Sequence, residues 1–201
     1  MSIFPDTDRM RLRPFTEDDV DNLVALDADP EVMRFLDGGK PTPRERVVSE
    51  VMPRVLRGFP VLGGAPGMWA AEERATGAFL GWFEMRPVDA ESAEILELGY
   101  RLRREAWGRG LATEGSLTLV DKAFTEYVGV ERIVADTMTV NSRSRRVMEK
   151  CGLTFQRTFF QDWPELIDGS EHGEVEYALT RDRWAARRAD PEAAPERPSG
   201  A

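Results

Sequence analysis

The chain has 201 residues, of which 41% are hydrophobic and 31% charged, proportions that are typical of a soluble globular protein with a substantial core. Its net charge of −9 has the wrong sign for wholesale nucleic-acid binding, which needs a basic face. The single cysteine excludes an internal disulfide. A chain with one cysteine and one histidine also has too few ligands for a Cys- or His-based metal site. The N-terminus shows no signal-peptide pattern and no apolar run is long enough to span a bilayer, so we expect a cytoplasmic protein that binds neither metal nor membrane.

The first part of the chain predicts one short strand and then helices. Residues 9–14 alternate apolar and polar side chains, which is typical of a strand. Thr16 precedes an acidic first turn and an apolar stripe, so we expect it to cap a helix. A second helical piece is expected near residues 30–36.

Residues 42–59 predict a further helix that is interrupted along its length. Thr42 is expected as its cap and Pro43 as its first residue, because proline is favoured at the first helical position. Pro53 lies inside the same segment and lacks the N–H that a helix interior requires. We therefore expect Pro53 to kink or split this helix.

From residue 68 the hydrophobic period changes to two, which predicts strands. The first two strands are expected to form a hairpin that turns at Thr76–Gly77. Helices are expected at residues 112–127 and 142–151, the second ended by Gly152. The expected strands are residues 68–74, 78–87, 94–102, 132–138, 153–161 and 174–180.

This order of elements indicates an α/β (α+β) fold, a mixed sheet with helices on both faces. One domain is expected over residues 1–188. Residues 189–201 are polar and rich in proline and alanine, so we expect a disordered tail.

The segment "RREAWGRGLATEG", residues 103–115, places two glycines between an expected strand and an expected helix. The first N–H groups of a helix lack partners and carry the positive end of its dipole, so they favour an anion. Glycine lets a phosphate approach the backbone and tolerates a positive φ. The spacing is not that of a P-loop, and Gly108 and Gly110 match only the first half of a dinucleotide fingerprint. These residues alone leave an anion site, a dinucleotide site and a plain tight turn open.

Two longer segments carry a resemblance. "ELGYRLRREAWGRGLATEG" and, some 30 residues on, "VADTMTVNSRSRRVMEKCGLTF" together resemble the GNAT superfamily of acyl-CoA-dependent N-acetyltransferases, closest to its RimJ/RimL branch. The likeness covers roughly residues 7–185 and implies a splayed, mostly antiparallel sheet of six to seven strands that holds acetyl-CoA. It also implies transfer of an acetyl group, by direct attack in a ternary complex, to a protein N-terminus or a small amine. Relatives often form homodimers, which makes this chain a candidate for one.

The resemblance implies a set of cofactor-binding residues. The pyrophosphate turn corresponds to Trp107, Gly108, Arg109, Gly110, Leu111, Ala112 and Thr113. The strand end that pairs with the pantetheine arm corresponds to Tyr100, Arg101, Leu102 and Arg103. Asn141 corresponds to an asparagine that holds the cofactor near the second helix, whose first turns contain Ser144, Arg145 and Arg146. From the residues alone, Asn141 is equally a helix cap, and the other three are equally solvated surface side chains.

Amide formation from a thioester needs a base for the amine and an outlet for the thiolate. Glu97 is the first candidate base and Glu84 the second, although an exposed strand glutamate explains Glu97 equally well. A backbone N–H near Tyr100–Leu102 is the expected donor to the developing oxyanion. Many relatives use a tyrosine as the acid, but Met148 stands in its place here. Ser144 is then a candidate acid, and unassisted thiolate departure is the alternative.

An acidic segment between the last two strands bears on the acceptor. It contains no lysine or arginine, and its acids are Asp162, Glu165, Asp168, Glu171, Glu174 and Glu176. We expect it either to attract a cationic amine or to be a solvated connection. Cys151 precedes a helix-stopping glycine and is expected in the core rather than as a nucleophile. A non-catalytic acyl-CoA sensor and a transferase of another acyl group, such as succinyl, remain alternatives.

Overall fold

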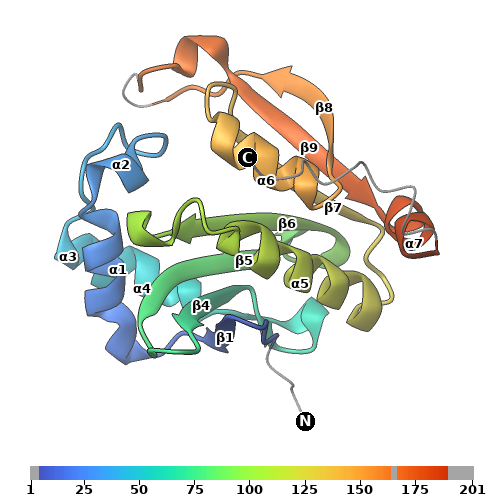
Figure 1. Ribbon diagram of the computed structural model, residues 1–201, viewed down its shortest axis with the longest axis horizontal. Helices are drawn as coiled ribbons and strands as arrows, with labels where there is room; N and C mark the ends of the chain where they lie inside the picture. The colour runs from blue at the N-terminus through green and yellow to red at the C-terminus, as the bar shows by residue number, and fades with distance from the viewer. Residues whose placement is uncertain (1–4, 164–166, 190–201) are drawn as a thin grey trace.

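The computed structural model describes residues 5–163 and 167–189, and a seven-stranded sheet lies at its centre (Figure 1). Only one neighbouring pair of strands is parallel, β6 with β7, and all the others are antiparallel. In spatial order the strands are β1 (Met10–Pro14), β4 (Met68–Glu73), β5 (Phe79–Asp89), β6 (Ser92–Leu102), β7 (Arg132–Met138), β9 (Glu174–Thr180) and β8 (Thr154–Phe159). The predicted mixed, mostly antiparallel sheet is confirmed.

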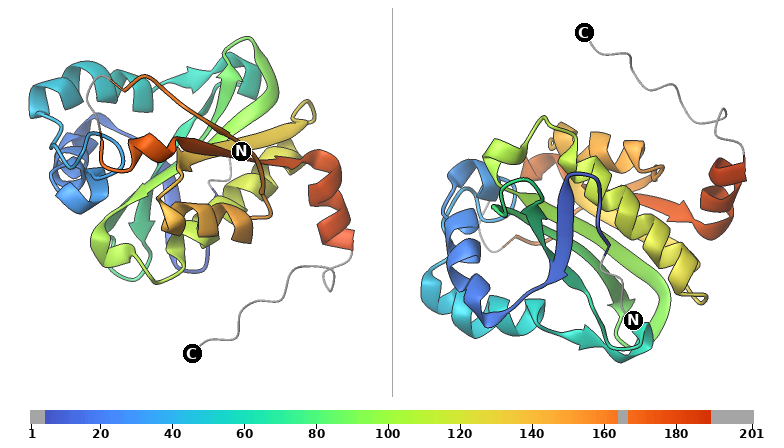
Figure 2. Two further views of the ribbon diagram at one scale, coloured as in Figure 1. Left: turned by 90° about the horizontal axis from the view of Figure 1, so that it is seen from above. Right: turned by 60° about the horizontal axis from the view of Figure 1, so that its bottom comes forward.

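Helices cover both faces of this sheet. The longest, α5 (Leu111–Glu126), lies across β5 and β6, and α6 (Ser142–Lys150) follows β7 (Figures 1 and 2). The opposite face of the N-terminal strands carries short helices. These are α1 (Val20–Asp27), α2 (Pro30–Met33), α3 (Arg44–Arg46) and α4 (Met52–Val55). Among the helices described, none is long and apolar enough to cross a membrane.

The period-two pattern of the strands divides the core into two clusters. In β4, Trp69 and Ala71 face the cluster that contains α5, whereas Met68 and Ala70 face the cluster that contains residues of α1, α2 and α4. Alternate side chains of a strand point to opposite faces, so one apolar strand serves both clusters. The sheet is therefore buried on both faces along its N-terminal half.

The helical segment after residue 42 begins differently from the prediction. Pro43 has a ψ of 143° and is the cap residue, so the helix begins at Arg44, and the prediction of Thr42 as the cap is wrong. The predicted interruption at Pro53 is confirmed. A π-helical stretch, Val47–Val51, lies directly before α4, whose second residue is Pro53. Proline offers no N–H to the preceding turn, and the backbone pairing shifts there.

One helix was not predicted. Helix α7 (Arg181–Ala189) follows β9 and is mostly polar, and Trp184 is its one large apolar side chain. The Arg181 guanidinium donates to the carbonyls of Phe124, Tyr127 and Val130 at 2.7, 2.8 and 2.7 Å, which anchors the start of α7 to the end of α5. Tertiary contacts thus define this helix. Of the predicted tail, residues 189–201, Ala189 is instead the last residue of α7, and residues 190–201 lie outside the described residues.

Candidate active site

The site is centred on the place where the two halves of the sheet separate. Parallel pairing between β6 and β7 ends at Glu97 opposite Val134. Beyond that point β6 remains paired with β5 as far as Leu102, and β7 remains paired with β9 as far as Met138. In the described chain, no strand pairs with the other edge of β6 after Glu97. That edge therefore offers free main-chain groups to an extended ligand (Figure 1).

The glycine turn lies at the far end of the same strand. Gly108 and Gly110 have φ values of 71° and 77°, a region that side chains other than glycine rarely adopt. A Cβ atom built on Gly108 would meet nothing within 4 Å, so the surface there is open. Gly110 is the cap residue of α5 and has no side chain to satisfy the first N–H groups of the helix. The turn thus combines an open surface at Gly108 with the unpartnered N–H groups of a helix N-terminus, which is suited to an anion.

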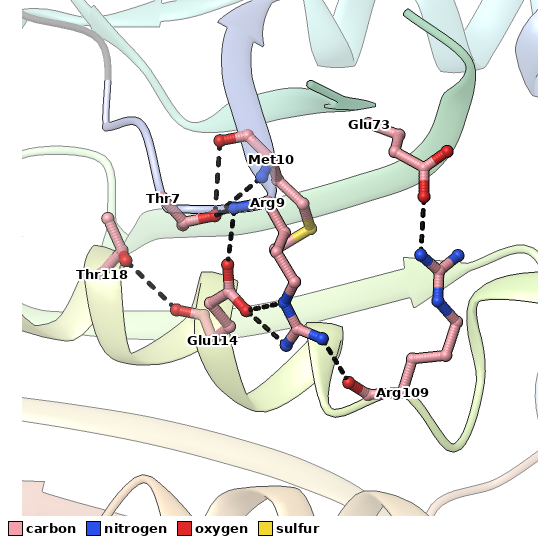
Figure 3. Close-up of polar contacts among 7 residues, drawn as sticks. All are labelled: Thr7, Arg9, Met10, Glu73, Arg109, Glu114 and Thr118. Atoms are coloured by element: carbon pink, nitrogen blue, oxygen red, sulfur yellow. Dashed lines mark hydrogen bonds and ion pairs between the residues drawn. The ribbon is translucent and has the colours of Figure 1, made fainter. Parts of the chain in front are cut away.

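A network from the N-terminal strand braces this turn (Figure 3). The Arg9 side chain donates to Glu114 in the first turn of α5 at 2.6 Å and to the Arg109 carbonyl at 2.8 Å. Although burial raises the pKa of Glu114, hydrogen bonds from Thr7 and Arg9 bring it below its usual value. Arg9 therefore compensates a carboxylate that lies close to the glycine turn. Sequence reasoning missed Arg9, because nothing local to it marks a partner 105 residues away.

The arginine side chains predicted to bind the cofactor mostly form ion pairs or ring contacts with other residues of this chain. Arg109 pairs with Glu73 at 2.6 Å, so its guanidinium lies against the hairpin between β4 and β5 (Figure 3). Arg101 pairs with the buried Asp27 at 2.5 Å, and its guanidinium lies 5.1 Å from the centroid of the Trp82 ring. The polar groups left for a ligand at this strand end are mainly those of the backbone.

Aromatic side chains position the connection between strand and turn. The Trp107 indole donates to the Leu102 carbonyl at 2.8 Å, and the Arg143 guanidinium of α6 lies 5.3 Å from the Trp107 ring centroid. The Arg103 guanidinium lies 5.5 Å from the Phe79 ring centroid. These contacts link the end of β6, the glycine turn and α6.

Tyr100 bridges the separation between β6 and α6. Its hydroxyl lies 2.8 Å from the Ser144 hydroxyl and donates to the Ser144 carbonyl at 3.0 Å. Asn141 caps α6 by accepting from the Ser144 N–H at 3.2 Å and donates to the Thr137 hydroxyl at 3.1 Å. Burial raises the pKa of Tyr100, so this phenol stays protonated. The structure thus brings Tyr100, Asn141 and Ser144 together.

The basic residues of α6 diverge from one another. Arg145 donates to the Tyr177 hydroxyl and to the Thr139 carbonyl, both at 3.1 Å, which ties it to β9 and to the loop after β7. Arg146 is exposed to solvent. Arg146 is therefore the better placed of the two for a ligand.

Both candidate bases share one arginine. Arg86 on β5 pairs with Glu84 at 2.7 Å and with Glu97 at 2.5 Å. Burial raises the pKa of Glu97, and the charge of Arg86 opposes this only in part. Glu97 also lines an open pocket of about 340 Å³, whereas Glu84 does not. The pocket is further lined by Val88, Val134, Asp136, Phe159 and Gln161.

Comparison with known proteins identifies the family. A family model described as an acetyltransferase (GNAT) domain matches residues 9–154. The chain belongs to the GNAT acetyltransferases. This acetyltransferase is 34% identical over 184 residues to the FsC-acetyl coenzyme A-N(2)-transacetylase of Aspergillus fumigatus, a match that covers 89% of this chain and 76% of the relative.

Solved structures share the fold of this acetyltransferase. RimL, a ribosomal L7/L12 alpha-N-protein acetyltransferase in complex with coenzyme A, superposes with a TM-score of 0.73 at 20% identity, covering 90% of this chain and 99% of RimL. Spermidine N-acetyltransferase from Vibrio cholerae, in complex with CoA and spermine, gives 0.72 at 13% identity, covering 89% and 99%. The RimL likeness supports the predicted branch only loosely, since identity this low shows the fold alone.

The acidic segment of the acetyltransferase divides in two: Asp162, Asp168 and Glu171 are exposed, whereas Glu174 and Glu176 are engaged inside the fold. Glu174 is 2% exposed and accepts from the Trp163 indole at 2.7 Å, and Glu176 pairs with Arg132 at 3.0 Å and Arg157 at 2.9 Å. Both glutamates lie in β9 rather than in a loop. Glu165 lies outside the described residues.

Two residues of α6 and its end belong to the core, as predicted for Cys151. Met148 and Cys151 are each 2% exposed, and burial raises the pKa of the Cys151 thiol to about 12. A thiol of that pKa is a poor nucleophile near neutral pH. Among the described residues, no group of three or more Asp, Glu, His or Cys side chains is placed to hold a metal ion.

Proposed function

We propose that this acetyltransferase moves the acetyl group of acetyl-CoA to a primary amine by direct attack within a ternary complex. The observation that carries the proposal is the end of β6–β7 pairing at Glu97. The free edge of β6 runs from that carboxylate to the glycine turn, and Glu97 and Leu102 are five residues, roughly 16 Å, apart. A ligand that uses both ends needs an anionic group and a reactive group joined by a long arm, as acetyl-CoA has.

The residues at the turn fit the pyrophosphate of this co-substrate. We assign its binding to the N–H groups of Leu111, Ala112 and Thr113, beside the open surface at Gly108 and Gly110. Hydrogen bonds to a charged group contribute about 1.5–3 kcal/mol each. Three such bonds would supply most of the roughly 8 kcal/mol of micromolar binding.

The remaining predicted residues line the path away from the turn. The backbone of Tyr100, Arg101, Leu102 and Arg103 would pair with the pantetheine arm. Trp107 and Asn141 would flank it, and the exposed Arg146 would meet a further phosphate. Arg109 contributes its charge and its backbone, since its guanidinium is paired with Glu73.

Glu97 is assigned as the general base. Burial raises the pKa of Glu97 toward neutrality, which makes this carboxylate a stronger proton acceptor, and the ion pair with Arg86 favours the ionised form. It would take the proton of the amine directly or through one water molecule. Glu84 is then the residue that positions Arg86.

Two further groups would act at the thioester that acetyl-CoA supplies. A backbone N–H within Tyr100–Leu102 would donate to the carbonyl oxygen as negative charge develops there. The Ser144 hydroxyl, held 2.8 Å from the Tyr100 hydroxyl, would deliver a proton to the departing sulfur. This pair takes the place of the tyrosine that is absent at Met148.

The pocket favours a small amine as the acceptor. Its volume of about 340 Å³ lies within the range of small-molecule sites, roughly 300–1,000 Å³. The transacetylase of Aspergillus fumigatus is named for an N(2) position, and the Vibrio cholerae structure holds spermine. A succinyl group would need a free cation, whereas Arg86, Arg132 and Arg157 are all paired.

Release of free CoA thiol tests the proposal. Acetyl-CoA and succinyl-CoA would each be incubated with the protein and a panel of primary amines and basic N-terminal peptides. We expect amine-dependent release with acetyl-CoA and small amines, and little with succinyl-CoA. Calorimetric binding of acetyl-CoA without amine-dependent release on any acceptor would support a sensor instead, and binding of NAD but not acetyl-CoA would refute the cofactor assignment.

A further inference from the structure

We infer that the acceptor carries two cationic groups, and that Asp136, supported by Glu174, binds the one that does not react. This rests on the proposed function, which requires only one carboxylate, Glu97, in the pocket. Asp136 lines the same pocket from β7. It is accounted for neither by the transfer of the acetyl group nor by the packing of the sheet.

The first observation is an excess of negative charge on this face of the sheet. Five carboxylates from four neighbouring strands face three arginines, which leaves two negative charges in excess. The carboxylates are Glu84, Glu97, Asp136, Glu174 and Glu176, and the arginines are Arg86, Arg132 and Arg157. The pocket therefore attracts cations.

The second observation is how the three arginines are distributed. Arg132 and Arg157 both bind Glu176, and Arg86 is shared by Glu84 and Glu97. No described side chain forms an ion pair or a hydrogen bond with the Asp136 carboxylate. Asp136 is thus a carboxylate of the pocket wall without an ion pair of its own, and the charge of Arg86, already paired with Glu84 and Glu97, is what favours its ionised form.

The third observation is an unpartnered oxygen beside it. Glu174 is 2% exposed, and its Oε2 atom has no hydrogen-bond partner within the part of the chain that the structure describes. The position lies on β9, two residues before Glu176, which is directly opposite Asp136. Burial raises the pKa of Asp136, and the charge of Glu174 raises it further, while the charge of Arg86 lowers it. Glu174 does not itself line the pocket, so we assign it an indirect role: its buried charge adds to the negative potential that draws an ammonium group to Asp136.

The strand register sets the spacing of the two carboxylates that would bind substrate. Val134 lies opposite Glu97, and Asp136 is two residues further along β7 on the same face, about 6.6 Å away. Since the strands diverge from that point, the separation from Glu97 is larger still. One nitrogen at Glu97 and another at Asp136 therefore fit a short, flexible diamine rather than a compact monoamine.

Putrescine and butylamine form a matched pair of probes, because they differ by one terminal ammonium group. For the wild-type protein we expect a kcat/KM at least about tenfold higher for putrescine. Asp136→Asn should remove this preference by raising the KM for putrescine about tenfold, with kcat within about twofold and no change for butylamine. Glu174→Gln keeps the acceptor for the Trp163 indole and should raise the same KM about threefold.

Asp168→Asn is the control, since it makes the same chemical change in the acidic segment away from the pocket wall. It should leave both amines unaffected. Acetylation of amines with an unchanged putrescine preference in Asp136→Asn would overturn this inference and leave the proposed function intact. If no amine is acetylated, the proposed function fails, and calorimetry with putrescine in the presence of CoA decides the inference separately. Saturable binding that Asp136→Asn abolishes supports it, and no binding by the wild type overturns it.

Discussion

The two ends of strand β6 carry sites of opposite construction. At one end the glycine turn offers backbone N–H groups and a helix N-terminus, and its side chains are mostly engaged elsewhere. At the other end, the pocket beside Glu97 is lined by carboxylates from three strands, Glu97, Asp136 and Glu176, and Glu97 is paired with Arg86 of a fourth strand. Backbone N–H donors do not titrate in the ordinary pH range, whereas the pKa values of carboxylates shift with burial and with the charge of their neighbours. The first site is therefore sensitive to shape and the second to charge.

The largest effect is expected from changing the shape of the turn. Replacing Gly108 and Gly110 together by valine places β-branched side chains at positive φ and on the open surface. Losing two hydrogen bonds to a charged group corresponds to about 3–6 kcal/mol, so acetyl-CoA affinity should fall at least about 100-fold. Isothermal titration calorimetry measures it.

Gly63 provides a matched control for backbone strain. It has a φ of 66°, and a Cβ atom there would also meet nothing within 4 Å. Replacing Gly63 by valine together with Gly64, which has a φ of 83° and equally open surroundings, should destabilise the fold to a similar extent and leave acetyl-CoA affinity unchanged. If acetyl-CoA affinity were the same in this control as in the Gly108/Gly110 variant, the assignment of the pyrophosphate to the glycine turn would be wrong.

The next effect concerns charge at the other end of the strand. Glu97→Gln keeps the shape of the side chain and removes the base, so kcat should fall about 100-fold or more. Affinity for acetyl-CoA should not change, because Glu97 lies at the acceptor end. Steady-state kinetics and calorimetry separate the two quantities.

The Glu84→Gln variant and a pH profile test further whether Glu97, rather than Glu84, is the general base. Glu84 shares Arg86 but does not line the pocket, so its variant should lose less than about fivefold in kcat. A carboxylate whose pKa is raised ionises at higher pH, so kcat/KM should rise with pH through a limb above the ordinary glutamate value of about 4.3. Glu97→Gln should abolish that limb. If Glu84→Gln abolished it instead, the two roles would be exchanged.

A smaller effect tests the double role of Asn141. Asn141→Ala removes a helix cap and should cost about 1 kcal/mol, which lowers Tm by roughly 2–4 °C in a chain of this size. Asn141→Asp restores a cap but adds a negative charge near the expected phosphates. Thermal unfolding should recover in that variant while acetyl-CoA affinity stays low. Full recovery of affinity would restrict Asn141 to a structural role.

The smallest effect is expected at the chain's single cysteine. Burial raises the pKa of Cys151 to about 12, so its thiolate is scarce at pH 8. A thiol reagent should modify Cys151 of the native protein only at the rate at which the fold opens to expose it. It should modify Cys151 of the unfolded protein at once. Rapid labelling with loss of activity would contradict a purely structural cysteine.

Local patterns predicted much of the fold and the glycine turn. Apolar runs mark β4 and β5, alternation marks β6 and β7, and glycines before a helix mark the turn, all of them features that lie within a few residues of each other. Helix α7 escaped prediction because contacts of Arg181 with distant carbonyls stabilise it. Pro43 shows a further limit, since its φ suits both the first helical residue and the residue before it.

The acceptor pocket could be predicted only in part. Glu97 was found because its position matches the family, but its partner Arg86 and its neighbour Asp136 come from other strands. The alternation within residues 132–138 places Asp136 on the polar face, yet only the register of β6 with β7 brings it to Glu97. Arg9 beside Glu114 is a similar case, because the pair is distant in sequence.

A crystal structure of the complex with acetyl-CoA tests the central claim most directly. We predict that the pyrophosphate accepts hydrogen bonds from the N–H groups of Leu111–Thr113 and that the arm follows the free edge of β6. The thioester carbon should then lie where β6 and β7 diverge, within reach of Glu97 directly or through one water molecule. A pyrophosphate bound away from the glycine turn, or a thioester remote from Glu97, would contradict the account.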